Sequence, residues 1–388
     1  MSFRPLYDSL RYGLRSITGR RIYFVMMVVI PLLGTFFFLN LMKSGLPTPV
    51  PVAVVGLDHS KMSRQLIRTL RTNQLTTITH DAESFNEAMR MVQSGETMGF
   101  FLIPADFQKD ANSGKSPTLS YFCNLTYFVP GSLSFKGFKT VAVSTTGGLA
   151  VAKLVGAGLS DDAAGTLVQP MAIQQNPIGN PWMNYNYYLS VSFLAGLISL
   201  LVMQTTAASI CYEIKNGTSR RWLDTSGGSI FVAITGKLLP QTAIWSIVGI
   251  AIEAILFKFC HFPLNNHAMH MIVAMVLMVI ACQSVAVIYC CMVPNLRLSL
   301  IFCSLTGILA FSVAAFSFPV ASMYPAVGIF SYILPVRYFF EIFSDQALCG
   351  FPIYYSRYYY VALLIFPLLA ILGISRIKRH CLNPVYVP

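Results

Sequence analysis

Six stretches of this sequence are almost free of charged residues, and most are long enough to cross a lipid bilayer. They cover residues 22–42, 187–212, 234–257, 268–293, 298–318 and 359–374. A helix needs about 20 apolar residues to cross a hydrocarbon core roughly 30 Å thick. Only 11% of the chain is charged, whereas a soluble domain is about 25% charged. The pattern predicts an α-helical polytopic membrane protein and excludes a soluble enzyme or a disordered chain.

The apolar stretches are arranged as one span, a long polar insert and then five spans. The run 22–42 follows Arg20 and Arg21 and lacks a small-residue cleavage site, so we interpret it as a retained helix rather than a signal peptide. We divide the chain into an interface helix (1–21), a first span (22–42), an extracytoplasmic α/β domain (43–183), five further spans with a coupling loop at 212–236 (184–376), and a cytoplasmic tail (377–388).

The distribution of basic residues predicts the orientation of the chain. Lys and Arg gather before the first span, between the second and third spans, and after the sixth, and such clusters mark the cytoplasmic side. We therefore predict a multi-pass protein of the cell membrane, or of the inner membrane in a two-membrane bacterium, with both termini cytoplasmic. The net charge is +12; most of this excess then faces the cytoplasmic leaflet and does not indicate a nucleic-acid partner.

An amphipathic helix precedes the first span. Phe3, Leu6, Leu10, Leu14 and Ile17 recur at spacings of three and four residues, which places them on one helix face. Such a helix lies at the membrane interface. Two interpretations stay open: the helix is a simple anchor, or it helps to hold a cytoplasmic partner.

The insert alternates strand-like and helix-like segments. The run 50–56 is followed by a helical pattern at 61–70, and a helical pattern at 84–96 is followed by an apolar run at 97–107. This alternation predicts a small α/β domain. His59 and His80 have no nucleophile motif near them, and Asp58 stands where a helix cap is expected, so we assign no catalytic site here.

The segment between the second and third spans carries a recognisable pattern. It contains Glu213, Gly217-Thr218, Leu223, Thr225 and the string GKLLP at 236–240. This pattern resembles the coupling loop of type-2 ABC transporter permeases. The resemblance extends to the one-plus-five layout, to the insert segments VAVVGLDHS and GFFLIPADF, and to FSFPVASMYP at 316–325.

The resemblance implies a permease subunit of an ATP-driven exporter, coupled through residues 212–225 to a separate ABC ATPase subunit. The residues expected to couple are Glu213, Gly217, Thr218, Arg220, Arg221 and Leu223. It also implies a homodimer or a heterodimer with a related permease, a re-entrant hairpin before the last span, and an outward-moving substrate that is amphiphilic or drug-like. A periplasmic adaptor protein is a further expected partner. The loop would tilt the second and fifth spans.

This chain has no phosphate-binding motif of the form G-x-x-x-x-G-K-[ST], which ATP-hydrolysing P-loop proteins need. We therefore predict that the chain is a transport subunit and not an enzyme. It would carry no cofactor of its own, and ATP and Mg²⁺ would bind to the partner ATPase.

Three ionisable residues fall within or beside the apolar segments. Glu253 lies inside the third span, where a charge is costly, and either lines a translocation path or pairs with a neighbouring cation. Arg337 and Glu341 are four residues apart, a spacing that allows an ion pair on one helix face. We expect that pair to be structural, with substrate contact as the alternative.

Other candidate features are weaker. Cys123 and Cys349 are both placed outside and could form a disulfide. His261, His267 and His270 cluster in one short loop, but they lack a recognised zinc-ligand pattern, and we assign no metal site. The alternative function is a membrane receptor or scaffold whose extracytoplasmic domain binds a ligand or partner without ATP-driven transport. A membrane-embedded enzyme would need paired catalytic groups, which the sequence does not show.

Overall fold

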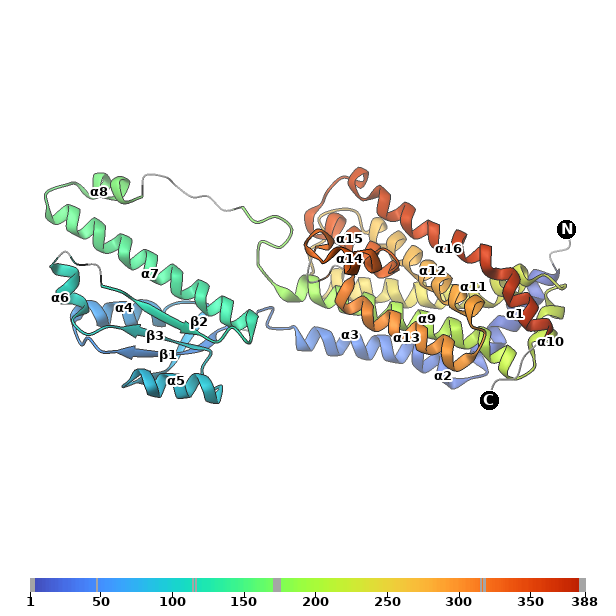
Figure 1. Ribbon diagram of the computed structural model, residues 1–388. Coiled ribbons are helices and arrows are strands. Elements are labelled where there is room, and N and C mark those ends of the chain that lie inside the picture. Colours follow the sequence, from blue (N-terminus) through green and yellow to red (C-terminus); the bar gives the residue numbers. More distant parts are fainter. Residues whose placement is uncertain are drawn as a thin grey trace. The chain divides into compact units, whose positions relative to one another are not determined.

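The computed structural model describes residues 4–46, 48–113, 115, 117–169, 176–314, 316 and 319–383. The chain forms two compact units (Figure 1). One comprises Met1–Gly45 with Pro177–Pro388, and the other is Leu46–Asn176. Phe3 and residues 384–388 of the predicted tail lie outside the described residues.

The smaller unit is a sheet covered by helices. Its strands are β1 (Val50–Gly56), β2 (Thr76–Ala82), β3 (Gly99–Ile103) and β4 (Ser120–Cys123), in the order β2-β1-β3-β4. β1 runs parallel to β2 and β3, and β4 is antiparallel to β3. The helices are α4 (Lys61–Arg71), α5 (Phe85–Ser94), α6 (Phe107–Asn112), α7 (Phe128–Gly156) and α8 (Asp161–Val168). This arrangement agrees with the α/β fold that the sequence predicts for the insert.

Alternating side chains of the central strands build two cores, because successive residues of a strand face opposite sides of a sheet. Ala53 and Phe100 pack with α5 on one face. Val54 and Phe101 pack with α4 and α7 on the other face. Asp58 accepts hydrogen bonds from the backbone amides of Ser60 and Gln108, so its role in the structure is to join two helix starts.

Among the described residues of the larger unit, six helical segments are long and apolar enough to span a membrane. They are Arg21–Leu41, Asn186–Lys215, Ile230–Phe259, Ala268–Met292, Leu296–Val313 and Ile353–Leu382. The six predicted spans are therefore confirmed as candidate membrane helices. The last one is longer than the predicted 359–374, because the helix continues through the basic residues that follow Ile374.

These spans are built from α2 (Arg21–Phe24), α3 (Ile30–Leu41), α9 (Val191–Lys215), α11 (Ile230–Ala254), α12 (Ala268–Met292), α13 (Leu296–Val313) and α16 (Ile353–Leu382), with single π-helical turns extending several of them. In the most apolar stretch of each span, 72% of the residues are buried in the span that contains α9 and 67% in α12. In the other four spans this share is at most 33%. α9 and α12 are therefore the central helices, and the others present apolar side chains outward.

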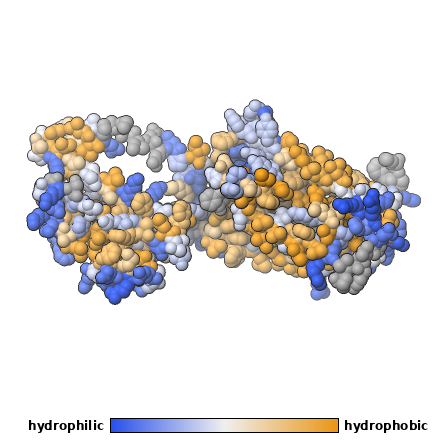
Figure 2. Space-filling view, viewed as in Figure 1, coloured by the Kyte–Doolittle hydropathy of each residue, from blue (hydrophilic) through white to orange (hydrophobic). Residues whose placement is uncertain are grey.

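The surface of the larger unit agrees with a membrane environment. Figure 2 shows hydrophobic residues over the visible face of the spans and hydrophilic residues at the end where α1 (Arg4–Thr18) and α10 (Ser219–Thr225) lie. On α13, large apolar side chains such as Ile301, Leu305 and Ile308 are more than half exposed. A continuous exposed apolar surface of this kind is stable against lipid rather than water.

A broken helix precedes the last span. α14 (Pro325–Ser331) is followed by α15 (Pro335–Phe343), which continues as a π-helical turn to Cys349, and the two parts are bent by 86°. Pro335 begins α15, as expected for a residue that has no backbone N–H to donate. The segment is the one where a re-entrant hairpin is predicted.

Candidate functional site

The short connection between α9 and α11 is a folded element rather than an open loop. α9 ends at Lys215, α10 covers Ser219–Thr225, and α11 begins at Ile230. Gly217, Gly227 and Gly228 have positive φ angles of 69°, 64° and 74°, a backbone region that glycine enters without steric cost. These glycines allow two sharp turns, which hold α10 across the ends of two spans.

A buried ion pair joins those two spans. Glu213 Oε1, near the end of α9, lies 2.5 Å from Lys237 Nζ on α11. Lys237 is fully buried and Glu213 is 6% exposed. Charges this well buried are stable only when paired and hydrogen-bonded. The pair therefore fixes α9 against α11 at this depth.

The second carboxylate oxygen of Glu213 is also fully engaged. It accepts hydrogen bonds from the Tyr12 hydroxyl, at 2.9 Å, and from the Thr218 hydroxyl. Burial, and next the negative charge of Glu213, raise the pKa of Tyr12 to about 12, so this hydroxyl remains a donor at neutral pH. We call Tyr12, Glu213, Thr218 and Lys237 the polar cluster; it joins α1, α9, the start of α10 and α11.

Trp222 of α10 covers the ammonium group of the polar cluster. Lys237 Nζ lies 4.8 Å from the centre of the Trp222 ring, within the range of a cation–π contact. Trp222 is completely buried. Packing against Lys237 thus explains why a short helix on the predicted cytoplasmic side carries a tryptophan. Trp222 links α10 to the ion pair.

The remaining predicted coupling residues divide into buried and exposed groups. Leu223 is 3% exposed and packs inside the unit, so it supports α10 from beneath. Arg220 is exposed and donates two hydrogen bonds to the Leu382 carbonyl at the end of α16. Gly217 and Arg221 are exposed. The outer surface of α10 therefore carries basic residues, and its inner surface binds the cluster.

The N-terminal helix α1 packs closely on α11. Ser9 is fully buried, and its hydroxyl donates to the Val232 carbonyl at 3.2 Å. A Cβ atom added at Gly13 would lie 2.6 Å from the carbonyl oxygen of Gly236, so the two backbones approach too closely for any larger residue. α1 is therefore an integral part of the helix assembly around the polar cluster and more than a membrane anchor.

The predicted ion pair between Arg337 and Glu341 does not form. Arg337, 7% exposed, donates from Nη1 to the Ser331 hydroxyl at 2.7 Å and stacks 4.0 Å from the centre of the Tyr332 ring. Side chains on a helix point toward its N-terminus, and Arg337 near the start of α15 reaches back to α14. Arg337 and Glu341 instead line a common cavity of about 500 Å³ beside the bend.

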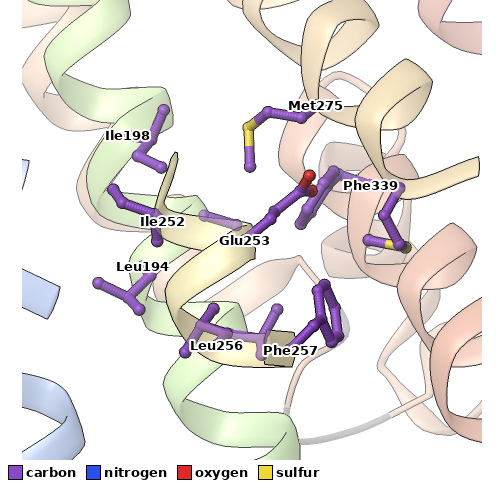
Figure 3. A pocket seen from close by; sticks show the side chains of 11 residues that line it. Leu194, Ile198, Ile252, Glu253, Leu256, Phe257, Met275 and Phe339 are labelled. Carbon is purple, nitrogen blue, oxygen red and sulfur yellow. The ribbon is translucent and has the colours of Figure 1, made fainter. Parts of the chain in front are cut away.

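Glu253 is buried in α11. It is 5% exposed, and within the described part of the chain neither of its carboxylate oxygens has a hydrogen-bond partner. Of the two alternatives left open by the sequence, pairing with a neighbouring cation is therefore not seen among these residues. Figure 3 shows the carboxyl group directed toward Met275 and Phe339, in a pocket whose other walls include Ile198, Leu256 and Phe257.

Two further features raised by the sequence are a cysteine pair and a metal site. Cys123 and Cys349 are both free thiols and lie in different units of the chain, so a disulfide between them stays an untested prediction. Among the residues that the structure describes, there is no group of three or more His, Cys, Asp or Glu side chains that could hold a metal ion.

Sequence reasoning singled out Glu213 but missed Lys237 and Tyr12 as its partners. Lys237 has a detectable signal, because a lysine about two turns inside an apolar helix needs a counter-charge. Tyr12 has no such signal, since its contact with Glu213 depends on how α1 packs against α11.

The fold and these sites define a polytopic membrane protein whose short interhelical segment is held by a buried polar cluster. The comparison with protein families assigns the class: residues 21–375 match the family described as ABC-2 family transporter protein. The chain belongs to this family of ABC transporter membrane proteins. A search of curated proteins found no match.

Proposed function

We propose that this chain is the permease subunit of an ATP-driven exporter that works as a dimer, as a homodimer or with a related permease. A separate ABC ATPase would drive it through the cytoplasmic segment 212–225, and the cargo would be an amphiphilic or drug-like molecule moved outward. Both termini would be cytoplasmic. The Leu46–Asn176 unit would then be extracytoplasmic, where it is available to a periplasmic adaptor.

The observation that carries this proposal is the way α10 is attached. Its inner side contacts the polar cluster through Trp222 and Thr218, and its Arg220 side chain binds the end of α16. A push on the outer surface of α10 would thus reach α9, α11 and α16 together. These are the second, third and sixth spans, rather than the second and fifth spans expected from the sequence.

The transmission would depend on the ion pair. Glu213 and Lys237 are in contact at 2.5 Å, and removing one partner of such a buried pair leaves the other charge without compensation. The pair is thus a short, stiff link between two spans at the end where α10 lies. Glu213 is too buried to be a major contact of the ATPase, and we assign it to the link instead.

Arg221, one of the two exposed arginines of α10, offers a test that leaves the buried link intact. Arg221→Glu should weaken co-purification of a nucleotide-binding subunit from detergent-solubilised native membranes and lower the ATPase activity of the recovered complex. The matched control is Arg297→Glu, at an exposed basic residue at the start of α13. We expect the control to retain both the subunit and its activity.

Recovery of a nucleotide-binding subunit in the wild type, with loss in Arg221→Glu alone, would support the coupling role of α10. Equal recovery in all three proteins would remove that role. If no nucleotide-binding subunit is recovered from any of them under conditions that preserve a dimer, the receptor or scaffold function is favoured.

A further inference from the structure

Glu253 is an unusual polar group of the larger unit. Its carboxyl group is 5% exposed and has no hydrogen-bond partner among the described residues. Buried polar groups are nearly always partnered, and an unpaired buried carboxylate is especially costly. The free-energy cost of burying the Glu253 carboxyl group must therefore be offset in at least one state of the protein.

The walls around the carboxyl group define what could compensate it. Besides aliphatic residues they consist of the aromatic rings of Phe257 and Phe339 and the thioethers of Met271 and Met275. None of these side chains has an N–H or O–H group to donate, so the pocket does not suit an anion. A bare metal cation needs several oxygen ligands, and the pocket offers those of one side chain.

Aromatic faces and a carboxylate together suit an organic cation. Aromatic rings attract ammonium-type groups, most strongly where water is excluded, and methionine side chains adapt to differently shaped apolar ligands. We propose that the pocket around Glu253 binds a lipophilic cation, an amine or quaternary onium compound whose positive centre pairs with the Glu253 carboxylate.

The position of the pocket relates it to the polar cluster. The pocket lies between α9, α11, α12 and α15, and α9 and α11 are the two helices that Glu213 and Lys237 join. The space left inside is only about 10 Å³, roughly the room for one water molecule. The cation therefore enters a form of the protein in which these helices have moved apart. Two of them, α9 and α11, are also helices that α10 would move.

This inference rests on the proposed function for its place in transport, but its test does not need the ATPase. The full-length protein in lipid nanodiscs is titrated with radiolabelled tetraphenylphosphonium. Triphenylphosphine oxide, a neutral compound with three of the same phenyl groups, serves as the competitor that isolates the effect of charge. We expect saturable binding of the cation and no displacement by equimolar triphenylphosphine oxide.

Two variants assign the binding to Glu253. Glu253→Gln keeps the size of the side chain and should lower the affinity for tetraphenylphosphonium about tenfold or more. Glu341→Gln removes one negative charge from a residue that lines a different cavity, and it should leave the affinity within twofold of the wild type.

Equal affinity of the wild type and Glu253→Gln, displacement by triphenylphosphine oxide as effective as by unlabelled tetraphenylphosphonium, or no saturable binding to the folded wild type would each overturn the inference. Failure of this inference and failure of the proposed function are distinguishable. If the cation does not bind, co-purification of an ATPase is unaffected. If no ATPase is recovered, the binding assay is unaffected.

Discussion

Glu213 and Glu253 are two glutamates of the same helical unit with nearly equal exposure, 6% and 5%, but their surroundings are opposite. Glu213 is bound by a lysine, a tyrosine and a threonine. Glu253 faces aliphatic, aromatic and thioether groups and has no partner among the described residues. The partnered glutamate has the features of a permanent structural link. The unpartnered one has those of a site completed by something from outside.

The largest expected effect comes from breaking the link. Lys237→Ala should lower the free energy of unfolding by about 3–5 kcal/mol, because Glu213 is then left buried without its counter-charge. Thermal unfolding of the purified protein in detergent measures this as a lower Tm. The double variant Glu213→Leu with Lys237→Met removes both charges and should recover most of the loss. A double variant no more stable than Lys237→Ala would contradict the account.

The opposite result is expected at the unpartnered glutamate. Glu253→Leu removes a polar group that has no hydrogen bond in its apolar pocket, so it should raise the free energy of unfolding by about 1–3 kcal/mol. The same thermal unfolding assay tests it, and Ile252→Leu on the neighbouring residue controls for a general effect of substitution. A lower Tm for Glu253→Leu would show that Glu253 has a stabilising partner in the resting protein.

Removing a single hydrogen bond from the link should have an intermediate effect. Tyr12→Phe deletes the hydroxyl that donates to Glu213 and should cost about 1.5–3 kcal/mol, the range for hydrogen bonds to charged groups. Tyr7→Phe on the same helix is the control, because Tyr7 is 65% exposed. Equal Tm values for the two variants would mean that α1 contributes nothing to the cluster.

The smallest expected effect is steric. Gly236→Ala introduces a Cβ atom 2.5 Å from Ser9 Cβ, which forces α1 away from α11 and should cost about 1–3 kcal/mol as overpacking. Limited proteolysis of the N-terminal segment reports the displacement directly. Ala251→Ser, at an exposed residue of the same helix, is the control, and it should leave the cleavage pattern unchanged. An unchanged cleavage pattern in Gly236→Ala would contradict the close packing of α1.

Hydropathy alone predicts the spans well because each is a mostly apolar run, and such runs need no knowledge of their neighbours. It fails at the helix ends. The last helix continues to Leu382 although Arg376, Lys378 and Arg379 mark the predicted end of the membrane. Strand β2 was missed because its sequence, TTITHDA, is largely polar, so it lacks the apolar alternation by which strands are predicted.

The candidate sites were predicted only as far as single residues allow. A glutamate in an apolar helix is visible in the sequence, but whether it is paired depends on residues far along the chain. Lys237 is 24 residues from Glu213 and Tyr12 is 201 residues from it. Arg337 and Glu341 have the spacing of an ion pair, yet Ser331 and Tyr332 provide better contacts for Arg337.

The side of the membrane on which α10 lies tests the central claim most directly. Asn216, exposed beside α10, is replaced by cysteine in a protein whose exposed Cys260 and half-buried Cys123 and Cys349 are changed to serine. Intact cells are then treated with a membrane-impermeant maleimide. We expect no labelling until the cells are permeabilised, whereas Cys260 of the unaltered protein is labelled from outside. Labelling of the Asn216→Cys protein in intact cells would place α10 out of reach of a cytoplasmic ATPase and contradict the account.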